Sequence, residues 1–297
     1  MHTDVHGIDG QYARHEYSRS GSNYSGRPDT STSMSNSDQI SFVAATSHVH
    51  ALSKTVELLY NICTNVNLRC DVSGLFVQAM SNTCMASVKL RIPRRLFHTY
   101  TCRRPIRLGL DVRAWSHVLS ISCDTVLMKY DAPHTCLQLE LLSGHADTVT
   151  TFTLQLMQLD EEEYTFPRHE YTMSFTLPSN VLFSMLRKLD EIAETIRLSI
   201  TSDGLVRVEA GDDFIEARLH TRPTTLFVVR SSSTRNLDYL AALQYSLSHL
   251  LGVCDTASFA HSAELHVGVG CPLFLRYRFD VDTEASCEIL LAPSIDD

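Results

Sequence analysis

The sequence repeats itself at a spacing of about 130 residues, and this repeat constrains the fold more than any other feature. GLFVQA at residues 74–79 is echoed by GLVRVEA at residues 204–210, and each copy follows a helix-patterned stretch at the same distance. A second pair agrees with the first, because SHVL at 116–119 returns as SHLL at 248–251. Two matched landmarks in one order predict two copies of one fold. Repeated modules often stack and can close into a ring or a superhelix.

Length and composition fit two ordinary folded domains. The chain has 297 residues, 44% of them hydrophobic, so each half can bury its own core. We expect neither a membrane-spanning helix nor a secretory signal, because no apolar run is long enough and the first residues lack an apolar segment. The nine cysteines are odd in number and form no CxxC pair, which favours reduced, buried thiols over disulfides or zinc ligands.

Hydrophobic periodicity predicts an α+β fold. Residues 1–39 nearly lack aliphatic side chains, so we expect them to be disordered. Helical spacing predicts helices over 48–62, 111–121 (capped by Asp111), 178–192 and 243–253. Strands are expected over 40–46, 68–72, 75–80, 86–92, 125–130, 135–141, 148–156, 171–176, 197–200, 205–210, 214–220, 263–269, 273–279 and 289–291. Two amphipathic helices in each half are expected to cover one face of an antiparallel sheet.

Charge is distributed unevenly along the chain. The net charge of −9 is not typical of a nucleic-acid-binding protein. Residues 91–113 nevertheless contain seven arginines, which could contact DNA at a rim or could protect strand edges. The four acids at 160–163 are interpreted as part of a solvated connector.

Five short motifs add a family resemblance to this picture. They are GLFVQAM at 74–80, FHTYTC at 97–102, LMQLD at 156–160, PRHEY at 167–171 and LAPSIDD at 291–297. Their order and spacing resemble the eukaryotic sliding clamp, the proliferating cell nuclear antigen family. The resemblance implies clamp domains at 40–155 and 171–297, joined by a connector at 156–170, with antiparallel sheets outside and helices lining a central hole.

The resemblance also implies a function. Such a chain forms a homotrimeric ring that encircles duplex DNA in the nucleus, placed there by an ATP-dependent clamp loader. It keeps a DNA polymerase on its template as a processivity factor and recruits other replication and repair proteins, which raises their effective concentration. It needs no cofactor. A subunit of a heterotrimeric, checkpoint-type clamp is the alternative that the same fold would serve.

Enzymatic readings are disfavoured by the residues themselves. The acids at 160–163 are contiguous and not spaced to converge on a metal. His48 and His50 would point to different sides of a helix, and GxSxG, P-loop and GxGxxG motifs do not occur. We therefore predict no catalytic residue and no metal site, and a DNA-processing enzyme such as a nuclease is the least favoured function.

Partner peptides that carry a glutamine and a pair of aromatic residues bind the family's clamps under the connector. By resemblance, the pocket residues here are Met80, Leu159, Tyr164, Phe166, Pro272 and Leu290, with Ala292 and Pro293 beside them. Apolar side chains among charges, such as Tyr164 and Phe166, often mark interaction sites, although they could instead pin the connector to the sheet. Cys84 stands where the family usually has a histidine.

The helices expected to face DNA carry few cations. By resemblance, the candidates for phosphate contact are Lys54, Arg113, Arg187 and Lys188, while several other family lysine positions hold Ser, Tyr, His or Asp. Each of the four could equally be part of a solvated face. We predict weak intrinsic DNA affinity with a shallow salt dependence.

Subunit contacts are expected from two β-rich segments. In the family, the last strand of the first domain pairs with a strand of the neighbour's second domain. Here these strands would be 148–156 and 214–220, with Phe152 and Phe214 as packing residues. Both would be exposed edges in a monomer.

Overall fold

The structure is a computed structural model that describes residues 40–132, 134–144, 147–160, 169–201, 203–211, 214–228, 244–257, 260–268, 270–279 and 285–294. The chain separates into two units, Met1–Asp38 and Gln39–Asp297, and the described residues all belong to the second. The predicted disorder of residues 1–39 therefore concerns a segment outside the described residues.

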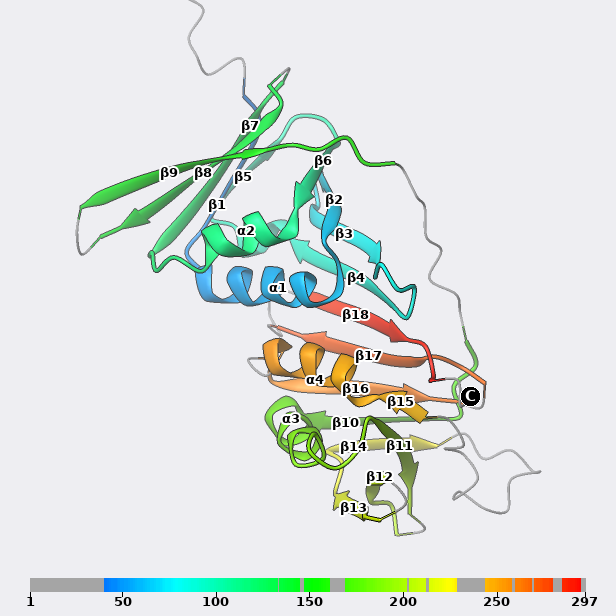
Figure 1. Cartoon of the computed structure of the whole chain (residues 1–297). Coiled ribbons are helices and arrows are strands. Elements are labelled where there is room, and N and C mark those ends of the chain that lie inside the picture. The colour runs from blue at the N-terminus through cyan, green and yellow to red at the C-terminus, as the bar shows by residue number, and fades with distance from the viewer. Residues whose placement is uncertain are drawn as a thin grey trace, which may run out of the picture. The chain divides into compact units, whose positions relative to one another are not determined.

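One antiparallel sheet continues from the first half of the sequence into the second (Figure 1). In order across the sheet its strands are β14 (Thr225–Val228), β10 (Met173–Pro178), β16 (Ser262–Val267), β17 (Leu273–Arg278), β18 (Ser286–Leu291), β4 (Ala86–Pro93), β3 (Gly74–Met80), β2 (Asn65–Asp71) and β6 (Ile106–Asp111). The halves join where β18 pairs with β4, from Ser286 opposite Arg91 to Leu291 opposite Ala86.

The other described strands form two smaller antiparallel sheets. The first is formed by β5 (Thr99–Cys102), β1 (Ile40–Thr46), β7 (Thr125–Asp131), β8 (Cys136–Ser143) and β9 (Thr148–Gln155), in that order. The second is formed by β13 (Glu216–Thr221), β12 (Val206–Gly211), β11 (Thr195–Ile200) and β15 (Gln244–Ser246). Within the described residues, β9 and β13 are edge strands with one paired neighbour each.

Four α-helices of the described residues lie along the sheets: α1 (Val49–Ile62), α2 (Val112–Leu119), α3 (Ser179–Arg187) and α4 (Leu247–Thr256) (Figure 1). The carboxylate of Asp111 accepts a hydrogen bond from the Ala114 amide at 2.7 Å, which confirms the predicted N-cap of α2. Helices α1 and α4 meet where the halves join, and Asn61 Nδ2 donates to the Gly252 carbonyl at 2.8 Å. The helices bury one apolar stripe each, as their 3.6-residue spacing predicts.

The sequence repeat corresponds to a structural repeat. Gly74 opens β3 and Gly204 precedes β12, each after a hairpin turn, and both have positive φ (144° and 80°). Only glycine adopts such values without strain, which explains why the motif recurs. The run α1-β2-β3-β4 therefore has its counterpart in α3-β11-β12-β13.

The predicted α+β class with antiparallel sheets is confirmed, but several boundaries are wrong. Helix α3 ends at Arg187 instead of 192, because the amides of Leu189 and Ile192 bond three residues back and tighten the chain into turns. Helix α4 begins at Leu247 instead of 243, since the preceding residues pair as β15. The strand predicted from residue 214 begins at Glu216. Strands β5, β6, β14 and β15 were not predicted.

Candidate functional site

The face of the nine-stranded sheet turned away from the buried core, here called the outer face, carries three ordered rows of side chains. In β3, for example, Leu75, Val77 and Ala79 are buried, whereas the alternating residues point outward. Strand register defines an arginine row (Arg107, Arg69, Phe76, Arg91, Ser286, Arg278), an ion-pair row (Asn67, Gln78, Lys89, Glu288, Arg276, Glu264) and an apolar row (Met80, Ser87, Leu290, Phe274, His266).

The apolar row contains two of the residues predicted for the peptide pocket, Met80 and Leu290. Met80 lies opposite Ser87, which lies opposite Leu290, so both apolar side chains belong to one row across the junction of the halves. The Ala292 amide donates to the Met85 carbonyl at 2.8 Å, which holds the chain end beside the β3–β4 loop. The structure thus brings together, at one end of the sheet, Met80, Pro272, Leu290, Ala292 and Pro293.

The connector starts at the far edge of this sheet. The Met157 amide donates to the Gly109 carbonyl at 2.8 Å, and Asn67 Nδ2 donates to the Asp160 carbonyl at 3.1 Å. A Cβ atom on Gly109 would lie 2.1 Å from the Met157 carbonyl oxygen, so only glycine permits this approach. Leu159 contacts this edge strand, β6, which is about 19 Å from β18 at the usual strand spacing. The structure therefore does not bring Leu159 to Leu290.

The connector ends against an aromatic cluster. Ring centroids lie 6.0 Å apart for His169 and Tyr171, 5.4 Å for Tyr171 and His266, and 5.0 Å for His266 and Phe274. Burial raises the pKa of Tyr171 to about 12. Phe274 and His266 were not predicted from the sequence. The signal available was an aromatic side chain at an outward position of the alternating strand β17. Tyr164 and Phe166 lie outside the described residues.

The ion-pair row separates the apolar row from the arginine row. Glu288 lies 4.0 Å from Lys89 and 3.0 Å from Arg276, and Arg276 lies 3.4 Å from Glu264. The Glu264 carboxylate also lies 2.8 Å from His266 Nε2. Burial raises the pKa of Glu264, but the contact with His266 and the nearby guanidinium groups outweigh it and hold this pKa below its ordinary value. Charges of both signs therefore alternate across the junction of the halves.

The helices carry little charge. Together α1 to α4 contain three basic residues (Lys54, Arg113, Arg187) and two acidic ones (Glu57, Asp255). Lys54 Nζ lies 2.7 Å from Glu57, which compensates its charge. Arg113 and Lys188 are exposed, and the Arg187 guanidinium lies 5.9 Å from the Phe183 ring centre. All four predicted cations are thus on helices or at a helix end, and one of them is already neutralised.

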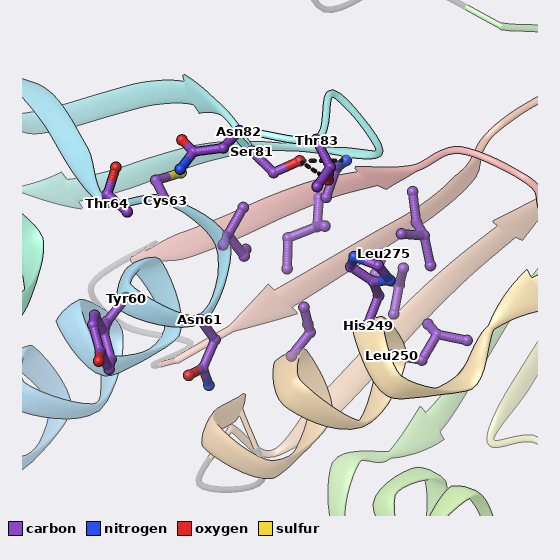
Figure 2. Close-up of a pocket in the computed structure, with 15 residues that line it drawn as sticks. Tyr60, Asn61, Cys63, Thr64, Ser81, Asn82, Thr83, His249, Leu250 and Leu275 are labelled. Carbon is purple, nitrogen blue, oxygen red and sulfur yellow. Dashed lines mark hydrogen bonds between the residues drawn. The ribbon is translucent and has the colours of Figure 1, made fainter. Parts of the chain in front are cut away.

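A cavity of about 210 Å³ opens between the end of α1, the β3–β4 loop and α4 (Figure 2). Ser81 Oγ accepts a hydrogen bond from the Ala86 amide at 3.0 Å and shapes this loop. No predicted site residue and no Lys, Arg, Asp or Glu lines the cavity, whose walls are Tyr60, Asn61, Ile62, Cys63, Thr64, Ser81, Asn82, Thr83, Ala86, His249, Leu250, Val253, Leu275, Ile289 and Leu291.

The two phenylalanines predicted for subunit contacts differ in their surroundings. Phe152 lies in the edge strand β9, is half-buried and packs against the core of its own half. Phe214 precedes β13 by two residues and its side chain is 93% exposed. The structure therefore places only Phe152 within an edge strand.

The described residues contain neither a group of side chains that could hold a metal ion nor a helix that could span a membrane. There, no group of three or more His, Cys, Asp or Glu side chains could hold a metal ion. No helix of the described segments is both long and apolar enough to span a membrane. Five of the nine cysteines are buried, namely Cys63, Cys70, Cys102, Cys254 and Cys287.

Comparison with known proteins agrees with this architecture. Residues 42–164 match the family described as proliferating cell nuclear antigen, N-terminal domain. The proliferating cell nuclear antigen of Chaetomium thermophilum is 25% identical over 254 residues, which cover 83% of this chain and 95% of that protein. Those of Dictyostelium discoideum and Saccharomyces cerevisiae are each 23% identical, covering 82% and 78% of this chain and 96% and 90% of theirs. The chain is thus similar to proliferating cell nuclear antigens over most of its length and resembles them as a divergent relative.

The fold agrees with that similarity. The crystal structure of proliferating cellular nuclear antigen from Entamoeba histolytica matches with a TM-score of 0.76 at 17% identity, over 86% of this chain and 100% of that one. At this identity the match shows the fold, which is the DNA clamp fold expected from the five motifs. The resemblance that the five motifs indicated is confirmed.

Proposed function

We propose that this chain is a ring-shaped DNA sliding clamp that acts as a DNA polymerase processivity factor and recruits replication and repair proteins. One observation carries the proposal. In the first half, β4 pairs with β18, the last strand of the second half. The counterparts of these strands, β13 in the second half and β9 at the end of the first, are both edges. Pairing β13 of one copy with β9 of the next repeats the internal junction and continues head to tail.

Such head-to-tail pairing closes into a homotrimer of six similar modules when the rotation per chain is one third of a turn. In this ring the helices face duplex DNA and the outer face carries the apolar row, where partner peptides with a glutamine and two aromatics bind. The chain has no catalytic role, works in the nucleus and needs an ATP-dependent loader to open the ring. Retention on DNA is topological, which suits the low charge of the helices.

Mass measurement followed by a processivity assay tests this function. Light scattering of the full chain is expected to give three times the chain mass of 33.3 kDa. With a clamp loader and primed circular DNA, the chain is expected to lengthen polymerase products at a fixed enzyme concentration. A monomer that trimerises only when mixed with other clamp subunits would favour the heterotrimeric, checkpoint-type clamp. A trimer without any effect on product length would contradict the role in processivity.

A salt titration tests the proposed DNA contacts of Lys54, Arg113, Arg187 and Lys188. Each phosphate neutralised by a protein adds about 0.9 to the slope of log affinity against log salt. The unloaded clamp is expected to bind duplex weakly, and changing all four cations to glutamine is expected to flatten this slope further. Tight, steeply salt-dependent binding by the unloaded wild-type chain would contradict the proposal.

A further inference from the structure

Two neighbouring rows on the outer face differ in how their charges are balanced. The ion-pair row contains Lys89 and Arg276 with Glu288 and Glu264, so its cations and anions are equal in number. The arginine row, two residues further along the strands, contains four arginines and no acidic residue. Like charges on adjacent strands repel one another. Although the chain has a net charge of −9, positive charge is thus concentrated along the arginine row of the outer face.

The centre of the arginine row is held in place by Phe76. The Arg69 and Arg91 guanidinium groups lie 5.2 Å and 5.9 Å from the centre of this ring, within the range of cation–π contacts. Asp71 also accepts from Arg69 at 2.9 Å. No described carboxylate forms an ion pair with Arg91. A guanidinium fixed against a ring loses less freedom when it binds an anion than one on a free side chain.

A surface hollow of about 240 Å³ adjoins this centre. Its walls are Arg69, Asp71, Pro105, Ile106 and Arg107. The arginine row therefore borders a concave surface and offers planar groups that suit carboxylate or phosphate oxygens.

The row also lies close to the proposed peptide pocket. Phe76 and Met80 are on the same strand and the same face, four residues apart, which is about 13 Å. A peptide seated at the apolar row could reach the arginines with about four further extended residues. An acidic protein segment fits better than DNA, because the row lies on the face opposite the helices.

We propose that the arginine row, centred on Arg69, Phe76 and Arg91, binds an acidic segment that flanks the clamp-binding motif of a partner protein. This inference rests on the proposed function, because the flanking segment is delivered by a peptide seated at the apolar row. The row then selects partners by charge, whereas the apolar row recognises the motif itself.

Fluorescence anisotropy with three labelled peptides tests the inference on the full chain. All carry the glutamine and aromatic-pair motif, and they differ in having a glutamine tail, an N-terminal glutamate tail or a C-terminal glutamate tail. One glutamate-tailed peptide is expected to bind about fivefold more tightly than the glutamine-tailed one at low salt. The gain is expected to shrink as salt is raised to a few times physiological strength, where exposed charges are screened.

Matched variants locate the effect. The double variant Arg69→Gln and Arg91→Gln is expected to abolish the gain while leaving the affinity for the glutamine-tailed peptide unchanged. The control Arg197→Gln and Arg222→Gln removes two exposed arginines outside the nine-stranded sheet and is expected to keep the gain. Circular dichroism of each variant shows whether the fold is retained.

The outcomes separate this inference from the function on which it rests. If no peptide binds, both the proposed peptide pocket and the proposed role of the arginine row are contradicted. If all three bind equally, or if the gain survives in the Arg69 and Arg91 variant, only the inference is overturned. Single-stranded oligonucleotide that binds wild type, is lost in that variant and displaces the glutamate tail would reassign the row to nucleic acid.

Discussion

The junction between the two halves and its unpaired counterparts differ in how much they bury. Strand β18, which closes the junction against β4, has four buried residues among its six. The corresponding strand of the first half, β9, has one buried residue among eight, and β13, the counterpart of β4, has none among six. The repeated module is thus paired with its neighbour where β4 meets β18, whereas the counterpart strands β9 and β13 remain edges within the described residues. Two open edges on one chain are what a head-to-tail assembly requires.

The largest expected effect comes from charging the open edge. Phe152→Asp on β9 is expected to convert the proposed trimer into monomers, because an aspartate buried at a strand pairing leaves an unpaired charge. Light scattering of the purified variant measures the mass. Since Phe152 also packs on its own core, Val149→Glu provides a second test at a side chain that is 60% exposed. If both variants remain trimeric, the edge is not β9.

The next effect concerns the proposed peptide pocket at the closed junction. In the second half the residue equivalent to Met80 is Gly211, which has no side chain to offer a peptide. Met80→Ala is expected to weaken binding of a motif peptide about tenfold, the size of a typical contact at the centre of an interface. Calorimetric titration measures the affinity. Gln78→Ala, on the same strand and face, serves as the control and is expected to bind normally; equal losses in both would argue against the pocket.

A smaller effect is expected from the helices that cross the junction. Asn61→Ala removes the hydrogen bond from α1 to the Gly252 carbonyl of α4 and is expected to lower the free energy of unfolding by about 1 kcal/mol. Urea denaturation measures this change. Asn61 and Asn82 both line the cavity of about 210 Å³ between α1 and α4, so Asn82→Ala is the control and is expected to leave the free energy of unfolding unchanged. A change within error for Asn61→Ala would mean that packing alone joins the helices.

The smallest expected effect depends on pH. A carboxyl whose pKa is depressed in the folded state adds stability above its unfolded pKa, and that stability is lost as pH falls through the folded pKa. Glu264, whose pKa is lowered by His266, Arg276 and Arg278 against the opposing effect of burial, is such a group. Glu264→Gln is expected to cost less than about 1 kcal/mol at neutral pH, and the cost is expected to vanish in acid. Urea curves at several pH values measure it.

The exposed Glu191 provides the comparison for this last test. Glu191→Gln is expected to leave the stability unchanged at every pH. A cost for Glu264→Gln that stays constant as the pH falls would mean that the ion-pair row does not act through the charge of this carboxyl.

Some features followed from the sequence alone because their causes are local. The helical stripes of α1 and α2, the alternation of most strands and the cap at Asp111 depend on residues a few positions apart. The recurrence of Gly74 and Gly204 required only that two turns need positive φ. These patterns, together with five ordered motifs, were enough to indicate the clamp fold and the family.

Other features were decided by contacts between distant residues. The pairing of β4 with β18 joins segments about 200 residues apart, and no local pattern specifies such a register. The short strands β14 and β15 exist because neighbouring strands supply hydrogen-bond partners, so their own periodicity is weak. Leu159 is held at β6 by the contact of Met157 with Gly109, and the arginine row forms only after β6, β2, β3, β4, β18 and β17 are aligned. The sequence by itself determined the two repeated modules. Tertiary pairing determined that β4 and β18 pair while β9 and β13 remain edges, and it aligned the rows of side chains on the outer face.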